Sequence, residues 1–547
     1  MMTGLVTICM VVSVTMVTAH AGPTKLTFAC PELKAYCKCR VDFEWWKVRN
    51  DYVHLKVVNC SYSSLSQVPD LSKLQDKTFH KLLLNNNEIR SLKREDFANI
   101  SVNEIVLRRN PLRHLSNDVF EGLRDSLEVL DIDSSRVKID TGLPFLQGLS
   151  NLKILDLGYN QLKNKYKTFP SGIFTGLNLS SLQMLTLQAL QMSNIDVGAF
   201  TGIEHLEQLD LSYNFLYEFP AELLVLKNLK YLKLYSNDIA NLKNGTFKGL
   251  SKMKQLLVGA NEIDTIDESA FEDLENSLEE LNLYHNPLYK VPSNALSRLR
   301  RLKKLSLVKT YIKSIVNGTF EGEYNLTELH LDHNPDLRFE DDGMLHGIEE
   351  SLNTLYITTL NLSQLPLNVL NRLNNLKYLD ASNNAFKRID KNFFGSLVLN
   401  HVHLSWNKIK SIDPRAFMNF ETGVTLNLHM NSLSDIKFIL DVERCTFDEV
   451  HVTGNNLNCD CKVENVLNSQ LVNWQIVGEC SLPGSDGKTR WLDFRDPGVM
   501  SHLRKSCPTT KPSNSCIQAS AVSSGVSAIL PSDCLIVCLW FLVLISL

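Results

Sequence analysis

The sequence has no surplus of basic charge, because its 56 lysines and arginines are outnumbered by 60 aspartates and glutamates, for a net charge of −4. This balance gives no sign of nucleic-acid binding. The chain also contains no phosphate-binding loop, no nucleophile elbow and no HExxH motif. We therefore expect no nucleic-acid partner, no cofactor, no metal and no enzymatic activity.

Cysteine is scarce, with 13 residues in a chain of 547, so disulfides cannot run along the whole length of the chain. Eight of them form two groups of four: Cys30, Cys37, Cys39 and Cys60 near the start, and Cys459, Cys461, Cys480 and Cys507 near the end. An even number per group and a secretory signal favour disulfides over zinc, and the spacing leaves three possible pairings in each group. We expect a buried free thiol at Cys445, whereas Cys516 is either unpaired or paired elsewhere.

The two ends of the chain carry its apolar runs. Residues 5–17 precede an Ala-His-Ala stretch and predict a signal peptide over residues 1–21. Residues 534–547 are uncharged but shorter than the roughly 20 residues of a membrane span, and no lysine or arginine follows them. This tail is preceded by a spacer, and the spacer by small residues that begin at Ser523. That order matches a glycolipid-anchor signal. We predict a stalk over 508–523, anchor attachment at Ser523 and removal of 524–547; a membrane span and secretion are the alternatives.

Between the cysteine groups the sequence repeats itself. The stretch LDLSYNFL, residues 209–216, recurs with a period of about 24 residues in the frame L-x-x-L-x-L-x-x-N, which is the leucine-rich-repeat signature. The final position of this frame, here called the ladder position, is Asn in twelve of sixteen units. Phenylalanine lies ten residues after it in nine units. The ladder positions are 87, 110, 135, 160, 190, 214, 237, 261, 286, 310, 334, 360, 384, 407, 431 and 455.

Such a unit cannot bury its apolar side alone, so units must stack. We expect each ladder asparagine to satisfy buried backbone groups in its own unit and the next, and the ladder to break at Leu190 and Leu360. The 30-residue step before Leu190 predicts an insertion on the return side. The predicted fold is an α/β leucine-rich-repeat solenoid over residues 79–456. It has a curved parallel β-sheet on the concave side and irregular or short helical segments on the convex side.

The stretch NNLNCDCKVENVLNSQLVNW, residues 455–474, resembles the start of the C-terminal cap of extracellular leucine-rich-repeat proteins, although Leu457 and Asn458 replace the usual Pro-Trp. That family includes chaoptin-like and connectin-like adhesion proteins, Toll-like-receptor ectodomains, lamprey lymphocyte receptors and non-catalytic subunits of secreted enzymes. The resemblance implies caps at 30–78 and 457–507. It also implies the disulfides Cys30–Cys39, Cys37–Cys60, Cys459–Cys480 and Cys461–Cys507.

The strand face is the predicted ligand site. Exposed aromatic side chains commonly anchor protein interfaces, and we assign this role to Tyr213, Tyr235, Tyr284, Tyr356, Tyr378 and Trp406. N-glycosylation signals are expected in caps, turns or the return side, which leaves this face bare; they lie at Asn59, Asn99, Asn178, Asn244, Asn317, Asn325 and Asn361.

Charged and titratable residues share the predicted face. Acidic residues at Asp131, Asp133, Asp156 and Asp210 lie there beside Arg108 and Arg109. So do seven histidines: His285, His330, His333, His401, His403, His429 and His451. Strands lie about 4.8 Å apart, so these histidines could titrate together or share a metal, although exposed polar positions are the simpler interpretation.

Three functions fit this pattern. The first is a cell-surface recognition or adhesion protein that binds a protein ligand or co-receptor and is held to the membrane by a lipid anchor. The second is an innate-immune pattern-recognition protein. The third is a non-catalytic subunit of a secreted enzyme complex.

Overall fold

The computed structural model describes residues 28–33, 35–46, 50–321, 325–421, 423–442, 446–467, 475–483 and 489–507. The predicted signal peptide, Cys445, Cys516, the stalk and the anchor site at Ser523 lie outside these residues. The chain forms two compact units. The first holds residues 1–137, 144–156 and 177–181, and the second holds 138–143, 157–176 and 182–547.

The first unit begins with an antiparallel hairpin. Its strands β1 (Lys38–Trp46) and β2 (Asp51–Asn59) are the longest of this unit, and β2 continues into a parallel sheet. That sheet runs through β3 (Thr78–Leu83), β5 (Ser101–Val106), β7 (Val129–Asp131) and β8 (Ile154–Asp156). A turn of helix, η1 (Pro31–Leu33), precedes the hairpin. The return segments contain β4 (Ser91–Leu92), β6 (His114–Leu115), η2 (Leu71–Lys73), η3 (Arg94–Phe97), η4 (Glu121–Leu123) and η6 (Pro144–Leu146).

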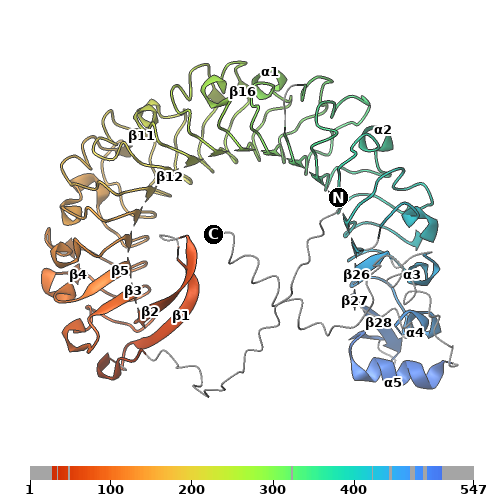
Figure 1. Ribbon diagram of the computed structural model, residues 1–547, viewed down its shortest axis with the longest axis horizontal. Helices are drawn as coiled ribbons and strands as arrows, with labels where there is room; N and C mark the ends of the chain where they lie inside the picture. The colour runs from red at the N-terminus through yellow and green to blue at the C-terminus, as the bar shows by residue number, and fades with distance from the viewer. Residues whose placement is uncertain are drawn as a thin grey trace, which may run out of the picture. The chain divides into compact units, whose positions relative to one another are not determined.

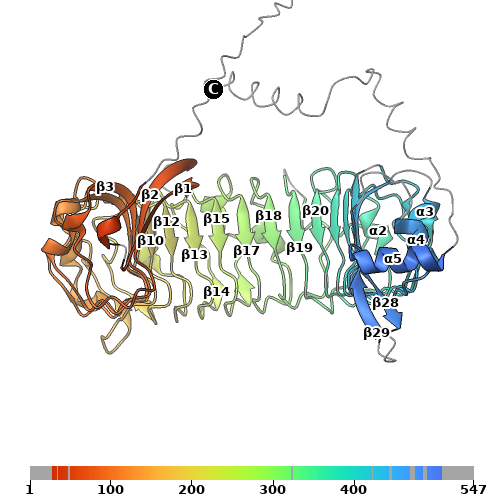
Figure 2. The same ribbon diagram turned by 90° about the horizontal axis from the view of Figure 1, so that it is seen from below.

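The second unit is built on a longer parallel sheet. Its strands follow the chain in order: β10 (Met184–Thr186), β12 (Gln208–Asp210), β13 (Tyr231–Lys233), β15 (Gln255–Leu257), β17 (Glu280–Asn282), β18 (Lys304–Ser306), β19 (Glu328–His330), β20 (Thr354–Tyr356), β21 (Tyr378–Asp380), β23 (His401–His403), β25 (Val424–Asn427), β26 (Phe447–His451) and β27 (Gln475–Val477). Figure 1 shows these strands along the inner side of an arc, with α1 (Ser293–Leu296) and α2 (Leu367–Leu370) on its outer side. Figure 2 shows β12 to β20 side by side.

The return segments of the second unit are short. They contain the two-stranded parallel pairs β9 (Thr168–Phe169) with β11 (Asn194–Ile195), β14 (Asn241–Leu242) with β16 (Thr265–Ile266), and β22 (Arg388–Ile389) with β24 (Ser411–Ile412). Single turns of helix fill the other positions: η5 (Ile139–Thr141), η7 (Ala221–Val225), η8 (Glu272–Leu274), η9 (Pro414–Phe417) and α3 (Phe438–Asp441). The insertion predicted before Leu190 lies here, because it supplies β9.

The core has the predicted composition. The central leucines of the repeat strands are almost completely buried, as at Leu209, Leu232 and Leu281. The nine predicted phenylalanines are all buried and lie on the return side of the same core: Phe97, Phe120, Phe145, Phe200, Phe247, Phe271, Phe320, Phe394 and Phe417. Rings of neighbouring units touch, with centroids 5.9 Å apart for Phe247 and Phe271. The solenoid fold expected from the period is therefore confirmed.

Each of the sixteen ladder positions follows one parallel strand, and all sixteen side chains are between 0 and 9% exposed. Asn214 shows the pattern. Its amide nitrogen donates to the carbonyl oxygens of Leu187 and Leu211, at 3.0 and 2.9 Å. Its amide oxygen accepts from the N–H groups of Leu190 and Met192, both at 3.0 Å. Leu187, Leu190 and Met192 belong to the preceding unit, so the expectation of bonding to the next unit was wrong in direction.

The turn before each ladder position is left-handed. The preceding residue has a positive φ in every unit, and in all but one unit it is not glycine. Tyr213, His285 and Trp406 are examples, with φ of 58°, 52° and 54°. A left-handed residue with a side chain costs about 1–2 kcal/mol, so the ladder hydrogen bonds must offset this strain in each unit. The repeat frame shows no sequence preference that reveals this turn.

The leucine ladder positions interrupt the hydrogen bonding only locally. Leu190 and Leu360 have no polar side-chain atom, yet their backbone N–H groups donate to the amide oxygens of Asn214 and Asn384, at 3.0 and 3.1 Å. The asparagine of the following unit therefore holds each leucine turn in place. The predicted break is therefore confined to the side-chain hydrogen bonds that an asparagine would make at these two positions and leucine cannot.

Both ends of the repeats are closed by disulfides with the predicted pairing. Cys30–Cys39 and Cys37–Cys60 join the first cap. Cys459–Cys480 and Cys461–Cys507 join the second, which contains α4 (Cys461–Leu467), α5 (Pro497–Ser506) and the hairpin of β28 (Glu479–Pro483) with β29 (Thr489–Asp493). Since these sulfurs are bonded to each other, the zinc alternative is excluded at these cysteines. Within the described ranges, no helix has the length and apolar character needed to cross a bilayer.

The ladder makes a prediction about Asn286, which is completely buried. Asn286→Ala removes the donor to Val258 and Leu283 and the acceptor of the Ile263 N–H. Stranding buried backbone groups in this way should cost about 2–4 kcal/mol. Urea unfolding and amide exchange at Ile263 measure the effect. The control Asn294→Ala removes an exposed hydrogen bond to Glu268 and should change little; equal losses in both variants would contradict the role of the ladder.

Candidate interaction surface on the strand face

The strand face of the second unit consists of side chains that point away from the core. In the strands from β10 to β26 these are the two residues that flank the buried central residue, which is usually leucine and points inward. Register places Tyr378 beside His401, and Tyr356 beside both His330 and Asp380. Parallel neighbours lie about 4.8 Å apart, so side chains at equivalent positions form continuous rows across the strands.

The six predicted ligand residues occupy three kinds of position. Tyr356 and Tyr378 lie in strands β20 and β21. Tyr235 and Tyr284 lie two residues after β13 and β17. Tyr213 and Trp406 lie in the left-handed turns and are 54 and 56% exposed. All six therefore reach the same side of the second unit, but only two stand within the sheet.

The structure brings Tyr356 and Tyr378 together with histidines. The rings of His330 and Tyr356 stack with centroids 4.1 Å apart and planes 6° from parallel. Tyr356 contacts Tyr378 at 5.2 Å, and Tyr378 stacks on His403 at 5.1 Å. We call these four residues the ring row. Trp406 contacts His429 separately, at 6.0 Å.

Carboxylates lie along the ring row. His330 Nε2 is 2.8 Å from Glu328 Oε1, and His330 Nδ1 is 3.7 Å from Asp332 Oδ2. Burial alone would lower the pKa of His330, but these two acids raise it above its ordinary value. Burial lowers the pKa of His403, with His401 and His451 acting in the same direction against Asp380. The two histidines therefore protonate at different pH.

The tyrosines of the row stay neutral. Burial, chiefly, raises the pKa of Tyr356 and of Tyr378 above the usual tyrosine value, and nearby carboxylates add to the shift. Their phenol groups can therefore donate hydrogen bonds across the physiological pH range. Their ring faces, rich in π electrons, are available to a ligand cation where no histidine covers them.

Tyr235 lies on a site that glycine shapes. A Cβ on Gly259 of the neighbouring unit would lie 2.6 Å from a ring carbon of Tyr235, so glycine leaves room for this ring. Burial, with the charge of Glu280, raises the pKa of Tyr235 to about 12. Tyr235 and Tyr213 therefore form a second aromatic site on this face, separate in sequence from the ring row.

The first unit gathers most of the predicted acids around one cation. Arg108 Nε lies 2.5 Å from Asp131 and 3.9 Å from Asp133, and its guanidinium lies 3.5 Å from Asp156. Burial, assisted by Asp156, raises the pKa of Asp131 to about 6 despite Arg108. Asp210 is not part of this group, because it pairs with Lys233 in the second unit at 3.8 Å.

Comparison with known proteins agrees with this geometry. The family described as Leucine rich repeat matches residues 180–239, 227–288 and 276–335, and the BspA type Leucine rich repeat region matches 72–184. These matches cover successive units of the ladder, and the capping disulfides flank them. The chain is a leucine-rich-repeat protein with cysteine-rich caps.

Its relatives cover different parts of it. Mouse CD180 antigen is 24% identical over 465 residues, which are 75% of this chain and 69% of CD180. Human Toll-like receptor 3 is 26% identical over 309 residues, 55% of this chain and 32% of the receptor. Human lumican is 34% identical over 203 residues, 29% of this chain and 60% of lumican. Together with the disulfides, these relatives support an extracellular recognition protein and leave its ligand open.

The glycosylation signals of this leucine-rich-repeat protein avoid the strands, with one exception. Asn99, Asn178, Asn244, Asn317, Asn325 and Asn361 all lie outside strands, in turns and return segments. Asn59 is the last residue of β2 and lies in register with Leu83 and, further along, with Asp131. The expectation that no signal lies at a strand-face position was therefore wrong at the N-terminal cap, and it holds across the second unit.

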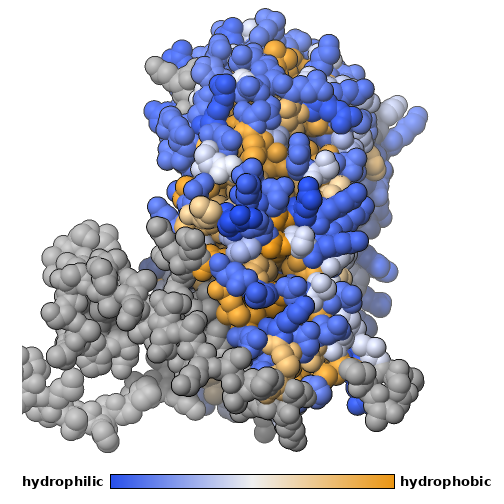
Figure 3. Space-filling view, turned by 90° about the vertical axis from the view of Figure 1, so that its right-hand side faces the viewer, coloured by the Kyte–Doolittle hydropathy of each residue, from blue (hydrophilic) through white to orange (hydrophobic). Residues whose placement is uncertain are grey.

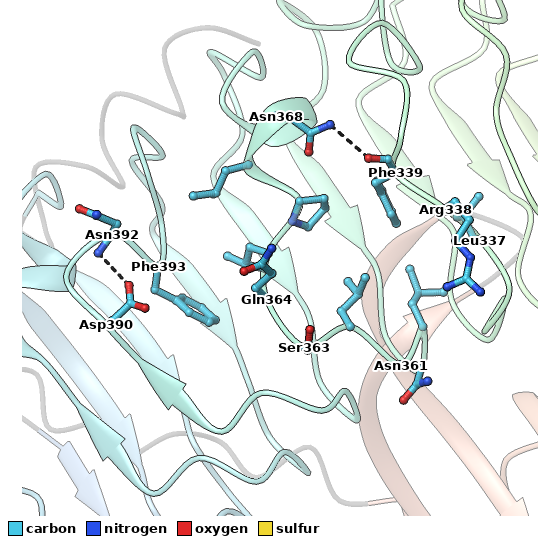
Figure 4. Close-up of a pocket in the computed structure, with 15 residues that line it drawn as sticks. Leu337, Arg338, Phe339, Asn361, Ser363, Gln364, Asn368, Asp390, Asn392 and Phe393 are labelled. Atoms are coloured by element: carbon cyan, nitrogen blue, oxygen red, sulfur yellow. Dashed lines mark hydrogen bonds between the residues drawn. The ribbon is translucent and has the colours of Figure 1, made fainter.

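A cavity of about 620 Å³ opens on the return side of three successive leucine-rich repeats. Figure 4 shows Phe339, Gln364 and Phe393 around it, and Asn361, a glycosylation signal, is among its lining residues. Asn368 donates to the Phe339 carbonyl oxygen at 3.1 Å across one edge. We assign no ligand to this cavity.

Figure 3, which views the molecule from the right-hand side of Figure 1, shows a mainly hydrophilic surface with hydrophobic residues in separate patches.

Metal binding has no support on the strand face. Within the described residues, the histidine, cysteine and acid groups that converge closely enough for an ion are Cys461, Glu464 and Cys507. Cys461 and Cys507 are already joined in a disulfide.

The raised pKa of Asp131 makes stability depend on pH. The folded protein holds this proton more tightly than the unfolded chain, whose aspartates titrate at about pH 4. Its stabilising effect is complete below that pH and is lost as the pH rises through about 6. Asp131→Asn should thus gain about 2 kcal/mol relative to wild type between about pH 4 and pH 7. Denaturant unfolding of both proteins at several pH values measures this effect; a difference in stability that does not vary with pH would refute it.

Proposed function

We propose that this protein is a cell-surface recognition or adhesion protein that binds a protein ligand through the strand face of its repeats. The observation that supports the proposal most is the pairing of exposed aromatic rings with a face free of glycosylation signals in the second unit. Aromatic side chains bury much area at low entropic cost and dominate protein interfaces. Return segments carry six of the seven signals, and bulky glycans there would hinder a partner.

The receptor-like relatives favour a related alternative. Similarity to CD180 antigen and Toll-like receptor 3 is consistent with a role in innate immunity, in which the same face would bind a microbial product or another receptor. Identities of 24 and 26% do not transfer a ligand. The subunit of a secreted enzyme complex remains a third proposal, distinguished by co-purification with an enzymatic activity.

A glycan placed on the face tests the proposal. Tyr284→Thr creates a glycosylation signal at Asn282, which stands on β17 at a face position. The glycan should abolish ligand binding, and Tyr356→Ala with Trp406→Ala should weaken it by about 2 kcal/mol or more. Binding is measured on an array of cell-surface and secreted proteins.

The matched control is Glu421→Thr, which creates a glycosylation signal at Asn419 on an exposed return segment. This glycan should leave binding intact. Binding that survives the glycan at Asn282 and is lost with the glycan at Asn419 would move the ligand site to the return side.

Attachment to the membrane belongs to the same proposal. We propose a glycolipid anchor at Ser523, on residues outside the described part of the chain, from the order of small site, spacer and apolar tail. Phosphatidylinositol-specific phospholipase should release the protein from intact expressing cells. Protein that stays on the cell with residues 534–547 detectable by mass spectrometry would exclude the anchor.

A further inference from the structure

The ring row and its surroundings carry an unusual set of charges. From β19 to β26, the two residues that flank the buried central residue of each strand and the two residues before each ladder position contain four carboxylates: Glu328, Asp332, Asp380 and Glu449. The same positions contain six histidines: His330, His333, His401, His403, His429 and His451. They contain no lysine and no arginine. With neutral imidazoles this surface has a formal charge of −4, and with all six protonated it has +2.

We propose that the ring row binds an arginine- or lysine-containing segment of the protein ligand at neutral pH and releases it at acidic pH. The inference rests on the proposed function and names the chemistry of the partner. A cation over a tyrosine ring is attracted to the π face, and a carboxylate beside it adds charge complementarity. Tyr356 and Tyr378 supply the rings, and Glu328, Asp332 and Asp380 supply the carboxylates.

Protonation of His330 reverses this arrangement. The His330 ring stacks on Tyr356 and lies beside Glu328 and Asp332, so its charged form adds a cation next to the rings and carboxylates that attract the ligand cation. Across the sheet, Lys304 of β18 already pairs with Glu328 at 2.9 Å and so consumes part of its charge. Because its pKa is raised, His330 gains this charge at a higher pH than an ordinary histidine does.

His403 acts at lower pH on the other end of the row. It stacks on Tyr378 and faces Asp380 of β21, His401 of its own strand and His451 of β26, while its neighbour on β25 is the uncharged Asn427. Because the pKa of His403 is lowered, its charge follows that of His330 as the pH falls. The row therefore loses its attraction for cations in two steps.

The test uses the purified full chain and two probes of equal length, an alternating Arg-Gly peptide and an alternating Glu-Gly peptide. Binding is measured at about pH 7.4 and about pH 5.5 at constant ionic strength. The Arg-Gly peptide should bind at the higher pH and lose about tenfold in affinity at the lower one, and the Glu-Gly peptide should not bind at about pH 7.4. Tyr356→Ala with Tyr378→Ala should weaken the Arg-Gly peptide about tenfold at about pH 7.4.

Three further variants separate this inference from general electrostatics. His330→Gln with His403→Gln should lose most of the pH effect, measured as the ratio of the variant's own affinities at the two pH values, whatever its affinity at about pH 7.4. The controls His346→Gln and Asp238→Asn, both outside the face, should behave as wild type. Arg-Gly binding that is absent, indifferent to the tyrosine pair or stronger at acidic pH would overturn the inference. If a glycan at Asn282 still blocks a protein ligand, the proposed function stands without it; if that glycan has no effect, the function itself fails.

Discussion

The hydrogen bonds from each ladder side chain to the backbone of the preceding unit are the constraint on which the rest of the structure depends. A chain that leaves a buried strand must satisfy its N–H and C=O groups without a sheet partner. One asparagine amide offers two donors and an acceptor, and Asn214 uses all three between two units. The bonds fix a left-handed turn after every strand. That turn sets the register of the sheet and the direction in which Tyr213 and Trp406 project.

Because of this arrangement, the side chains of the strand face are not needed to hold the repeats together. Leucines and phenylalanines supply the core, asparagines supply the turns and disulfides close the ends, so the outward positions have no packing role to fulfil. In the second unit they carry tyrosines, histidines and carboxylates in rows. The ring row crosses four strands in parallel register. His330 and Tyr356 are register partners, whereas Tyr378 contacts Tyr356 and His403 diagonally. A solenoid thus converts separate sequence positions into one continuous surface.

Much of the fold could be predicted from the sequence because its determinants are periodic. The leucine frame and the phenylalanine column identify the buried residues, and the resemblance of the caps to extracellular relatives supplies the pairings that spacing alone leaves open. The sequence does not show whether each ladder asparagine bonds the preceding or the following unit, because an amide can donate and accept hydrogen bonds toward either one. The left-handed residues could not be read either, since Tyr213, Ala260 and Met430 share no side-chain property.

The candidate surface was predictable only in part. Exposure of Tyr213 and Trp406 follows from their place in the frame, whereas the stacking of His330 on Tyr356 depends on side-chain rotamers that a periodic pattern does not specify. Seven histidines were expected on this face, but their contacts with the tyrosines were not predicted. The strand-face position of Asn59 was missed for another reason. Strand β2 belongs to the cap and lacks the repeat frame, yet it pairs with the repeat sheet.

The central claim is that the strand face of the second unit binds the protein ligand. Hydrogen–deuterium exchange on the complex with the first protein ligand identified tests it most directly, because backbone amides report which segments lose access to solvent or mobility. The account predicts slower exchange on binding in residues 328–333, 354–359, 378–383 and 401–406, with return segments unchanged. Slower exchange confined to return segments such as 363–368, or to the disulfide-bonded caps, would contradict it.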